Sequence, residues 1–179
     1  MAVLHLLVGL PGAGKTTTAR ALAEQHRALR LTPDEWMIPL FHDNDAGGRR
    51  DVLEGRFVST ALELLRLDVD VVLDFGLWSR DERAALHHLA TAAGARCRSV
   101  YLPVGPEEQW RRVQGRAGTV GSSTFAMTRE DLDGWRLRFE PPDEAELAGG
   151  APARPVPTGS SSWEEWAVER WPSLVVAHR

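Results

Sequence analysis

Residues 9–16 read GLPGAGKT, and this stretch decides the fold of the chain. Its spacing, G-x-x-x-x-G-K-[ST], is the pattern of a phosphate-binding loop. The flanking segments fit, because the apolar residues 3–8 predict a buried strand and residues 17–29 predict a helix. Glycines let successive backbone N–H groups turn toward one anion, and the helix N-terminus adds its positive end. The stretch therefore predicts a strand–loop–helix unit that binds the phosphates of a nucleotide.

Lys15 is the only lysine of the chain, among 21 lysine and arginine side chains. A compact ammonium fits between phosphate oxygens where a planar guanidinium does not. We expect Lys15 to reach the β- and γ-phosphates, the Thr16 hydroxyl to coordinate Mg²⁺, and Thr17 to contact the α-phosphate. A plain glycine-rich turn is the alternative, and the combination of strand, spacing and helix disfavours it. The expected nucleotide-binding residues are Gly9, Gly12, Ala13, Gly14, Lys15, Thr16 and Thr17.

Composition narrows the class of protein. The 179 residues, with a mass of 19.8 kDa, suit one domain with one substantial core. No apolar run approaches the roughly 20 residues of a membrane span, and a strand follows Met1 so closely that we expect no signal peptide. The single cysteine, Cys97, lies in an expected strand, which predicts a core thiol and no internal disulfide. We therefore expect a cytoplasmic protein that does not bind membranes.

The rest of the chain alternates strands and helices, which is typical of a parallel sheet covered on both faces. Apolar runs predict strands at residues 3–8, 29–31, 69–73 and 98–102, and we expect a short last strand around residues 154–156. The predicted fold is therefore a three-layer α/β P-loop fold with a central parallel sheet of about five strands.

Capping patterns mark where the helices begin. Residues 32–35 (TPDE) place a threonine cap before a proline at the first helical position, with a glutamate three residues after the cap. Ser79 and Glu82 form a second capping box, and weaker versions begin at Gly105 and Thr128.

Two carboxylates are expected beside the phosphate loop, because ligands bind outside the carboxyl ends of parallel strands. Asp34 follows the second expected strand and Asp74 ends the third. Asp34 fits a base that orients and deprotonates an attacking hydroxyl, and a carboxylate that complements the helix dipole is the alternative. Asp74 fits an acid that holds Mg²⁺ through water, and a turn residue at the end of a strand is the alternative.

Arg112 and Arg116 lie four residues apart and therefore share one face of an expected helix. This helix leads into residues 117–125, a stretch rich in glycine, serine and threonine that predicts a mobile loop. A guanidinium closing over the transferred phosphoryl group would neutralise the charge that develops there. The competing interpretation is a solvated basic face paired with Glu107 or Glu108.

Three further side chains are candidates for substrate contact, because each lies close in sequence to a proposed site residue. Trp36 follows Asp34, and Trp78 and Arg80 follow Asp74. The alternatives are core packing for the two tryptophans and a solvated first-turn position for Arg80.

With these residues in view, the chain resembles the AAA_33 family, small bacterial P-loop ATP-binding proteins of the zeta-toxin and polynucleotide-kinase-like group. The resemblance covers about residues 3–146. It rests on four stretches, GLPGAGKTT at 9–17, LTPDEWM at 31–37, VDVVLDFGLWSRDER at 69–83 and FEPPDEAE at 139–146.

This resemblance implies an adenylate-kinase-like P-loop fold that binds ATP with Mg²⁺ and transfers the γ-phosphate to a hydroxyl. By the same resemblance Lys15 and Thr16 hold the nucleotide and Asp34 is the catalytic base. Arg112 and Arg116 then belong to a small lid, at about residues 111–128, whose arginines take part in catalysis together with Lys15.

One position departs from the polynucleotide kinases of this group, which carry an arginine three residues after the catalytic aspartate, where this chain has Met37. Together with a formal net charge of −4 and a pI of about 5.9, this disfavours a nucleic-acid substrate. We therefore expect a single kinase domain over residues 1–179 that phosphorylates a hydroxyl of a small molecule, such as a metabolite, sugar, nucleoside or antibiotic. A polynucleotide 5′-hydroxyl kinase and a zeta-toxin-like nucleotide-binding regulator are the alternatives.

Overall fold

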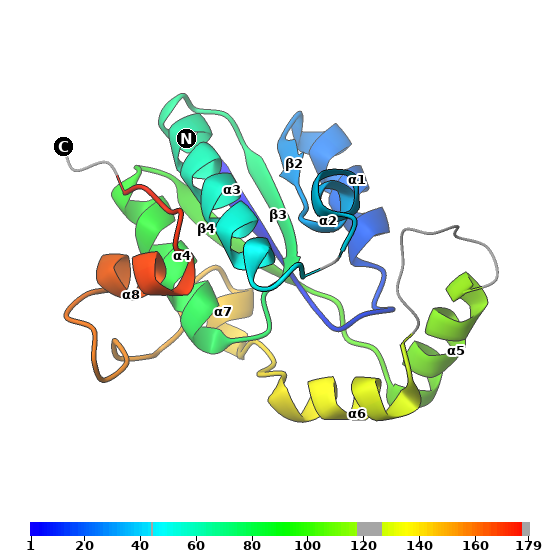
Figure 1. Cartoon of the computed structure of the whole chain (residues 1–179). Helices are drawn as coiled ribbons and strands as arrows, with labels where there is room; N and C mark the ends of the chain where they lie inside the picture. The colour runs from blue at the N-terminus through cyan, green and yellow to red at the C-terminus, as the bar shows by residue number, and fades with distance from the viewer. Residues whose placement is uncertain (44, 118–126, 177–179) are drawn as a thin grey trace.

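Four parallel strands form the sheet of the computed structural model, which describes residues 1–43, 45–117 and 127–176, without the side chains of 116 and 117 (Figure 1). The strands are β1 (Val3–Val8), β2 (Leu29–Leu31), β3 (Val71–Gly76) and β4 (Arg96–Tyr101). They lie in the order β2-β3-β1-β4, and Leu4 of β1 is opposite Val71 of β3 and Cys97 of β4. The strand that carries the phosphate loop is therefore flanked on both sides.

Helices cover both faces of this sheet (Figure 1). They are α1 (Lys15–His26), α2 (Asp34–Phe41), α3 (Arg49–Arg66), α4 (Arg80–Ala92), α5 (Pro106–Ala117), α6 (Arg129–Arg138), α7 (Glu144–Leu147) and α8 (Trp163–Arg170). α1 packs on one face, whereas α3, α4 and α8 pack on the other. α5 and α6 pack against each other beyond the carboxyl end of β4. None of the described helices is long and apolar enough to cross a membrane.

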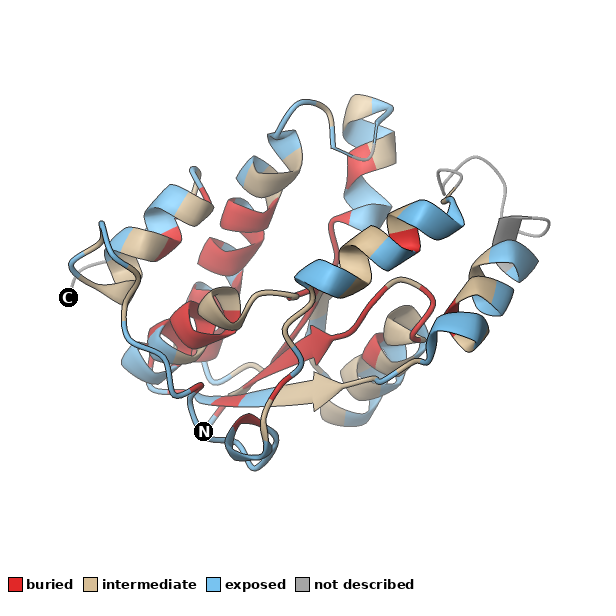
Figure 2. Ribbon diagram, turned by 90° about the horizontal axis from the view of Figure 1, so that it is seen from below, coloured by how far each residue is buried: buried red, intermediate tan, exposed pale blue. Residues whose placement is uncertain are grey.

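Two apolar cores arise because alternate residues of a strand point to opposite faces of the sheet. Leu4 and Leu6 of β1 belong to the larger core, with Phe57 of α3. Leu7 of β1 instead packs in a smaller core with Ala19 of α1. Figure 2 shows the buried residues gathered along the strands and on the inner faces of the helices. The predicted three-layer α/β P-loop fold is thus confirmed.

Cys97 lies in β4 and is buried. Burial raises the pKa of its thiol to about 12, so the thiolate that a nucleophile needs does not form at neutral pH. The prediction of a core thiol is confirmed.

The helix starts were predicted correctly at three of the positions with a capping pattern, and α5 begins directly after Gly105 as one of them predicts. Ser79 caps α4 and Thr128 caps α6, each in a reciprocal capping box. The threonine cap expected before α2 is wrong, because α2 begins one residue later than expected, with Pro33 at the cap position. Thr32 is therefore one residue too far back to cap the first turn, and its side chain is buried instead.

The short strand expected around residues 154–156 does not form, so the sheet has four strands in the described part of the chain. Pro152, Pro155 and Pro157 surround this position, and proline has no N–H to donate to a ladder. Arg154 instead donates its backbone N–H to the Pro152 carbonyl at 2.8 Å, and its side chain pairs with Asp81.

Candidate active site

The loop between β1 and α1 requires glycine at two positions. Gly12 has a φ of 80° and Gly14, the cap residue of α1, has a φ of 97°, a region that other residues rarely adopt. A Cβ at Gly12 would also lie 3.2 Å from the Gln109 carbonyl oxygen. Lys15, the first residue of α1, donates from Nζ to the Leu10 carbonyl at 3.1 Å, so its ammonium already folds back over the loop. This is the strand–loop–helix unit that the motif predicts.

Side chains from other elements hold the carbonyl groups of this loop. Trp78 Nε1 donates to the Gly9 carbonyl at 3.3 Å, Gln109 Nε2 to Pro11 at 3.0 Å, and Arg112 Nη1 to Gly12 at 3.3 Å. Each bond restrains one backbone carbonyl of the loop. The loop is therefore preorganised by α5 and by the segment after β3, so less ordering is needed when phosphate binds.

A cavity of about 1080 Å³ opens beside the loop. Gly12, Gly14, Lys15, Thr16 and Thr17 line one part of it. Other parts are lined by residues of α2, α3, α6 and α8 and by the end of β3 with the segment that follows it, and β2, α4 and α5 each add one residue. A cavity of this size has room for a nucleotide and a second small molecule.

Asp34 lines the same cavity as Lys15 and Thr16. It is the first residue of α2, and its carboxylate is 70% exposed. Arg50 at the start of α3 pairs with Asp34 Oδ1 at 2.9 Å and with Glu54 Oε1 at 3.1 Å. The carboxylate of Asp34 is thus accessible to a ligand, and the guanidinium of Arg50 orients it.

Asp74 of β3 also lines the cavity, but its carboxylate is buried against Arg30 of β2. Arg30 donates to Asp74 Oδ2 from Nε at 3.2 Å and from Nη2 at 2.9 Å, and it also pairs with Glu35. The hydrogen bond from Arg30 is the main reason why the pKa of Glu35 is lowered. Among the described residues, no hydrogen bond ends on Asp74 Oδ1. Thr16 and Asp74 both line the cavity, and a hydroxyl with a carboxylate is a donor set that fits Mg²⁺.

Beyond Asp34 the cavity wall carries a network of acids and arginines that sequence reasoning missed. Glu54 of α3 is buried at its centre, with Trp171 Nε1 donating to Oε2 at 3.3 Å. Arg170 of α8 lies 3.7 Å from Glu54 and 2.7 Å from Glu82 of α4, and it also pairs with Asp51. Burial raises the pKa of Glu54 to about 7, and the nearby arginines only partly oppose this.

Of the three candidates for substrate contact, only Trp78 lines the cavity. Its ring lies against Trp135 of α6, with centroids 5.9 Å apart. Trp36 is 49% exposed and packs edge-on against Phe57 outside the lining. Arg80 is also outside the lining, with its Nε 3.8 Å from Glu146 of α7. Substrate contact by Trp36 or Arg80 thus stays a prediction that this cavity does not support.

Of the two arginines expected in a lid, Arg112 has a described side chain and Arg116 does not. Arg112 combines both interpretations, because it pairs with Glu108 at 2.6 Å and also reaches the Gly12 carbonyl of the loop. Arg116 lies in α5, but its side chain is outside the described residues, as are residues 118–126 of the expected lid. A role of Arg112 or Arg116 in catalysis therefore stays a prediction.

Arg138 at the end of α6 is a further candidate functional residue of the cavity, and the sequence analysis did not predict it. It lines the cavity, and its Nε donates at 3.4 Å to the Gly134 carbonyl of its own helix. No carboxylate of the described residues pairs with it, whereas Arg20, Arg30, Arg50 and Arg170 of the same cavity all have acidic partners. The spacing of Arg138 from Trp135, one helical turn, is the only local signal that could have indicated it.

The loop, the parallel sheet and the cavity at its carboxyl edge define a P-loop nucleotide-binding protein. The chain belongs to the AAA_33 family, whose model, described as an AAA domain, matches residues 4–142. No curated protein sequence matches the chain. The family predicted from the sequence motifs is thus confirmed.

Solved structures of low identity share the fold. Kti12 of Chaetomium thermophilum, in complex with ADP-AlF3, has 16% identity and a TM-score of 0.64, over 97% of this chain and 100% of that chain. A gluconokinase from Sinorhizobium meliloti 1021 has 18% identity and a TM-score of 0.55, over 96% and 90%. A chain of the Pnkp1/Rnl/Hen1 RNA repair complex has 18% identity and a TM-score of 0.65; the match covers 76% of this chain but only 43% of that one.

Proposed function

We propose that the protein is an ATP-dependent phosphotransferase that moves the γ-phosphate to a hydroxyl of a small molecule. One observation carries this proposal: the exposed carboxylate of Asp34 lines the same cavity as Lys15 and Thr16 of the phosphate loop. A phosphoryl transfer to an alcohol needs a phosphate cradle and a carboxylate that accepts the hydroxyl proton.

Each residue then has one task. Bound ATP with Mg²⁺ supplies the phosphoryl group and spreads its charge. Lys15 and the loop amides hold the phosphates, and Thr16 and Asp74 would hold the metal ion. Asp34 takes the proton of the acceptor hydroxyl while the oxygen of that hydroxyl bonds to the γ-phosphorus and the bond from the γ-phosphorus to ADP breaks. Arg50 positions Asp34 through their 2.9 Å ion pair.

The charges around Asp34 support an acceptor without phosphate groups. Arg50 and Arg170 are both occupied by carboxylates in this part of the cavity. Met37, at the position where polynucleotide kinases of the group carry an arginine, is fully buried and does not line the cavity. The similar structures include both a gluconokinase and an RNA repair complex, so the fold alone does not choose between these acceptors. The paired arginines and Met37 favour a neutral or cationic hydroxylated molecule.

ADP release in the presence of a panel of hydroxylated metabolites, sugars, nucleosides and antibiotics tests the proposal. We expect at least one of them to stimulate ADP release and to gain a phosphate, detected by mass spectrometry. Asp34→Asn should abolish the stimulation and keep ATP affinity. The matched control is Asp68→Asn, at an exposed position where the left-handed backbone, with a φ of 61°, tolerates asparagine.

Other outcomes would overturn the proposal in distinct ways. Phosphorylation of a 5′-hydroxyl oligonucleotide but of no small alcohol would identify a polynucleotide kinase. ATP binding with no transfer to any hydroxyl would indicate a nucleotide-binding regulator. Normal turnover by Asp34→Asn would show that the base is a different residue.

A further inference from the structure

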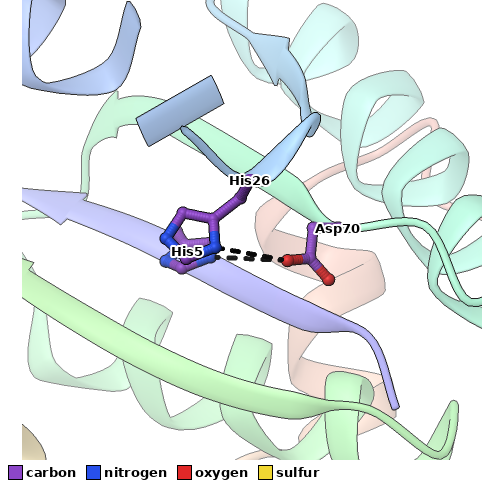
Figure 3. Close-up of side chains that lie close together, drawn as sticks. All are labelled: His5, His26 and Asp70. Atoms are coloured by element: carbon purple, nitrogen blue, oxygen red, sulfur yellow. Dashed lines mark ion pairs between the residues drawn. The ribbon is translucent and has the colours of Figure 1, made fainter. Parts of the chain in front are cut away.

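Three side chains with metal-binding atoms meet at the amino-terminal end of the sheet, opposite the cavity (Figure 3). His5 comes from β1, His26 is the last residue of α1, and Asp70 directly precedes β3. One imidazole nitrogen from each histidine and one carboxylate oxygen all lie within 4.8 Å of one another. No other group of this kind occurs in the described part of the chain.

The spacing of these atoms suits an ion better than direct hydrogen bonds. Asp70 Oδ2 lies 4.0 Å from His5 Nε2 and 3.8 Å from His26 Nδ1, and both distances are too long for hydrogen bonds. Ligand atoms around a tetrahedral Zn²⁺ stand roughly 3.3 Å apart, given bonds of about 2.0–2.1 Å. Each nitrogen therefore needs to approach Oδ2 by less than about 1 Å to share a metal ion with it.

His5 is the second, independent sign of a ligand. Its side chain is buried, with 2% of its surface exposed, and neither ring nitrogen has a hydrogen-bond partner among the described residues. Buried polar groups in folded proteins are nearly always bonded. In Figure 3 the His5 ring lies beside that of His26, and dashed lines run from both rings to Asp70. A metal ion at this point would satisfy Nε2 of His5.

The carboxylate is already oriented for this task. Asp70 Oδ1 accepts a hydrogen bond from the Val3 backbone N–H at 2.8 Å, and the Asp70 carbonyl accepts one from Leu29 at 3.1 Å. These outer contacts leave Oδ2 directed at the imidazoles, as second-shell bonds do in metal sites. The carboxyl end of α1, where His26 lies, adds a partial negative charge that favours a cation.

We propose that His5, His26 and Asp70 form a site for a divalent transition metal, Zn²⁺ above all. Two imidazoles and one carboxylate are borderline-soft ligands that suit Zn²⁺, and they do not suit the all-oxygen preference of Mg²⁺. The side chains of His26 and Asp70 are 32% and 21% exposed, so solvent reaches the site and supplies water as the fourth ligand. Arg98, opposite His5 in the register of β4, is exposed, and solvent screens its charge.

Such a site would act as a structural clamp. It joins β1, the carboxyl end of α1 and the start of β3, and these are the elements that position the phosphate loop from behind. The bound ion would stabilise the folded chain by mass action. At a metal concentration about 100 times the Kd, the expected rise in Tm is about 5–10 °C for a chain of this length.

Zinc titration of the full chain, produced without a histidine tag, tests the site. We expect one Zn²⁺ per chain by elemental analysis and calorimetry, a rise in Tm on adding Zn²⁺, and a visible spectrum of four-coordinate Co²⁺ when Co²⁺ replaces it. His26→Gln and Asp70→Asn should each weaken Zn²⁺ binding by more than about tenfold and remove the rise in Tm. Asparagine keeps an oxygen for the Val3 N–H, so this variant retains the fold.

His88→Gln is the matched control, because His88 pairs with Glu164 away from the cluster. Zn²⁺ binding and the zinc-induced change in Tm should be the same in this variant as in the wild type. Absence of stoichiometric Zn²⁺ and Co²⁺ binding would overturn the proposal. Binding that survives both His26→Gln and Asp70→Asn would also overturn it.

Discussion

Replacing Glu54 by glutamine isolates the energetic effect of the acid at the centre of the cavity network. Burial raises the pKa of Glu54 from 4.5 to about 7, despite the attraction of Arg50 and Arg170. Below about pH 4.5 the side chain is protonated in both the folded and the unfolded chain. As the pH rises to 7 the unfolded chain releases this proton first, so the folded state loses stability. With about 1.4 kcal/mol per pKa unit, the loss is about 3 kcal/mol.

Urea unfolding of wild type and Glu54→Gln across this pH range measures the effect. Glutamine cannot titrate and keeps an oxygen for Trp171 Nε1. The free energy of unfolding of the variant minus that of the wild type should therefore rise by about 3 kcal/mol from pH 4.5 to pH 7.5. Glu63→Gln, on the exposed side of the same helix, is the control, with an expected change within about 0.5 kcal/mol. A difference for Glu54→Gln that stays flat across these pH values would refute the reasoning.

Three other substitutions have definite expected outcomes. Asp34→Asn should lower kcat by about 10²–10⁴-fold while ATP affinity, measured by calorimetry, stays within about twofold. Glu146→Gln should lower the free energy of unfolding by about 3–5 kcal/mol, because it leaves the fully buried Arg83 without its carboxylate at 2.7 Å. A Tm equal to that of the wild type would contradict this. Gly12→Ala should weaken ATP binding at least tenfold, because the new methyl group meets the Gln109 carbonyl and the backbone has a positive φ. An unchanged affinity for ATP would show that the loop adjusts freely.

The sequence alone was sufficient to predict the structure where the conformation of a residue depends on its immediate neighbours. The phosphate loop is formed by consecutive residues, so its spacing predicted the strand–loop–helix unit that the structure shows. The capping boxes at Ser79 and Thr128 are local in the same sense. Asp34 and Asp74 are far apart in sequence, but the rule that ligands bind at the carboxyl edge of a parallel sheet was enough to bring both to one cavity.

The sequence was not sufficient where the direction of a side chain or a distant partner decides a contact. Trp36 and Arg80 are adjacent in sequence to site regions, their side chains lie toward Phe57 and Glu146, and their contact with a substrate stays a prediction. The pairing of Glu54 with Arg170 joins α3 to the last helix, and no local pattern reports such a contact.

The last helix contributes to the cavity from outside the family segment, and the residue after it contacts Glu54. Arg170 and Trp171 lie beyond residues 4–142, the segment that matches the family model, yet both brace Glu54 in the wall of the cavity. One wall of the cavity is therefore completed by a residue outside the matched segment, whereas the phosphate loop lies wholly within it. Replacing the chain after residue 142 is expected to alter the surroundings of Glu54 and to leave the residues of the phosphate loop unchanged.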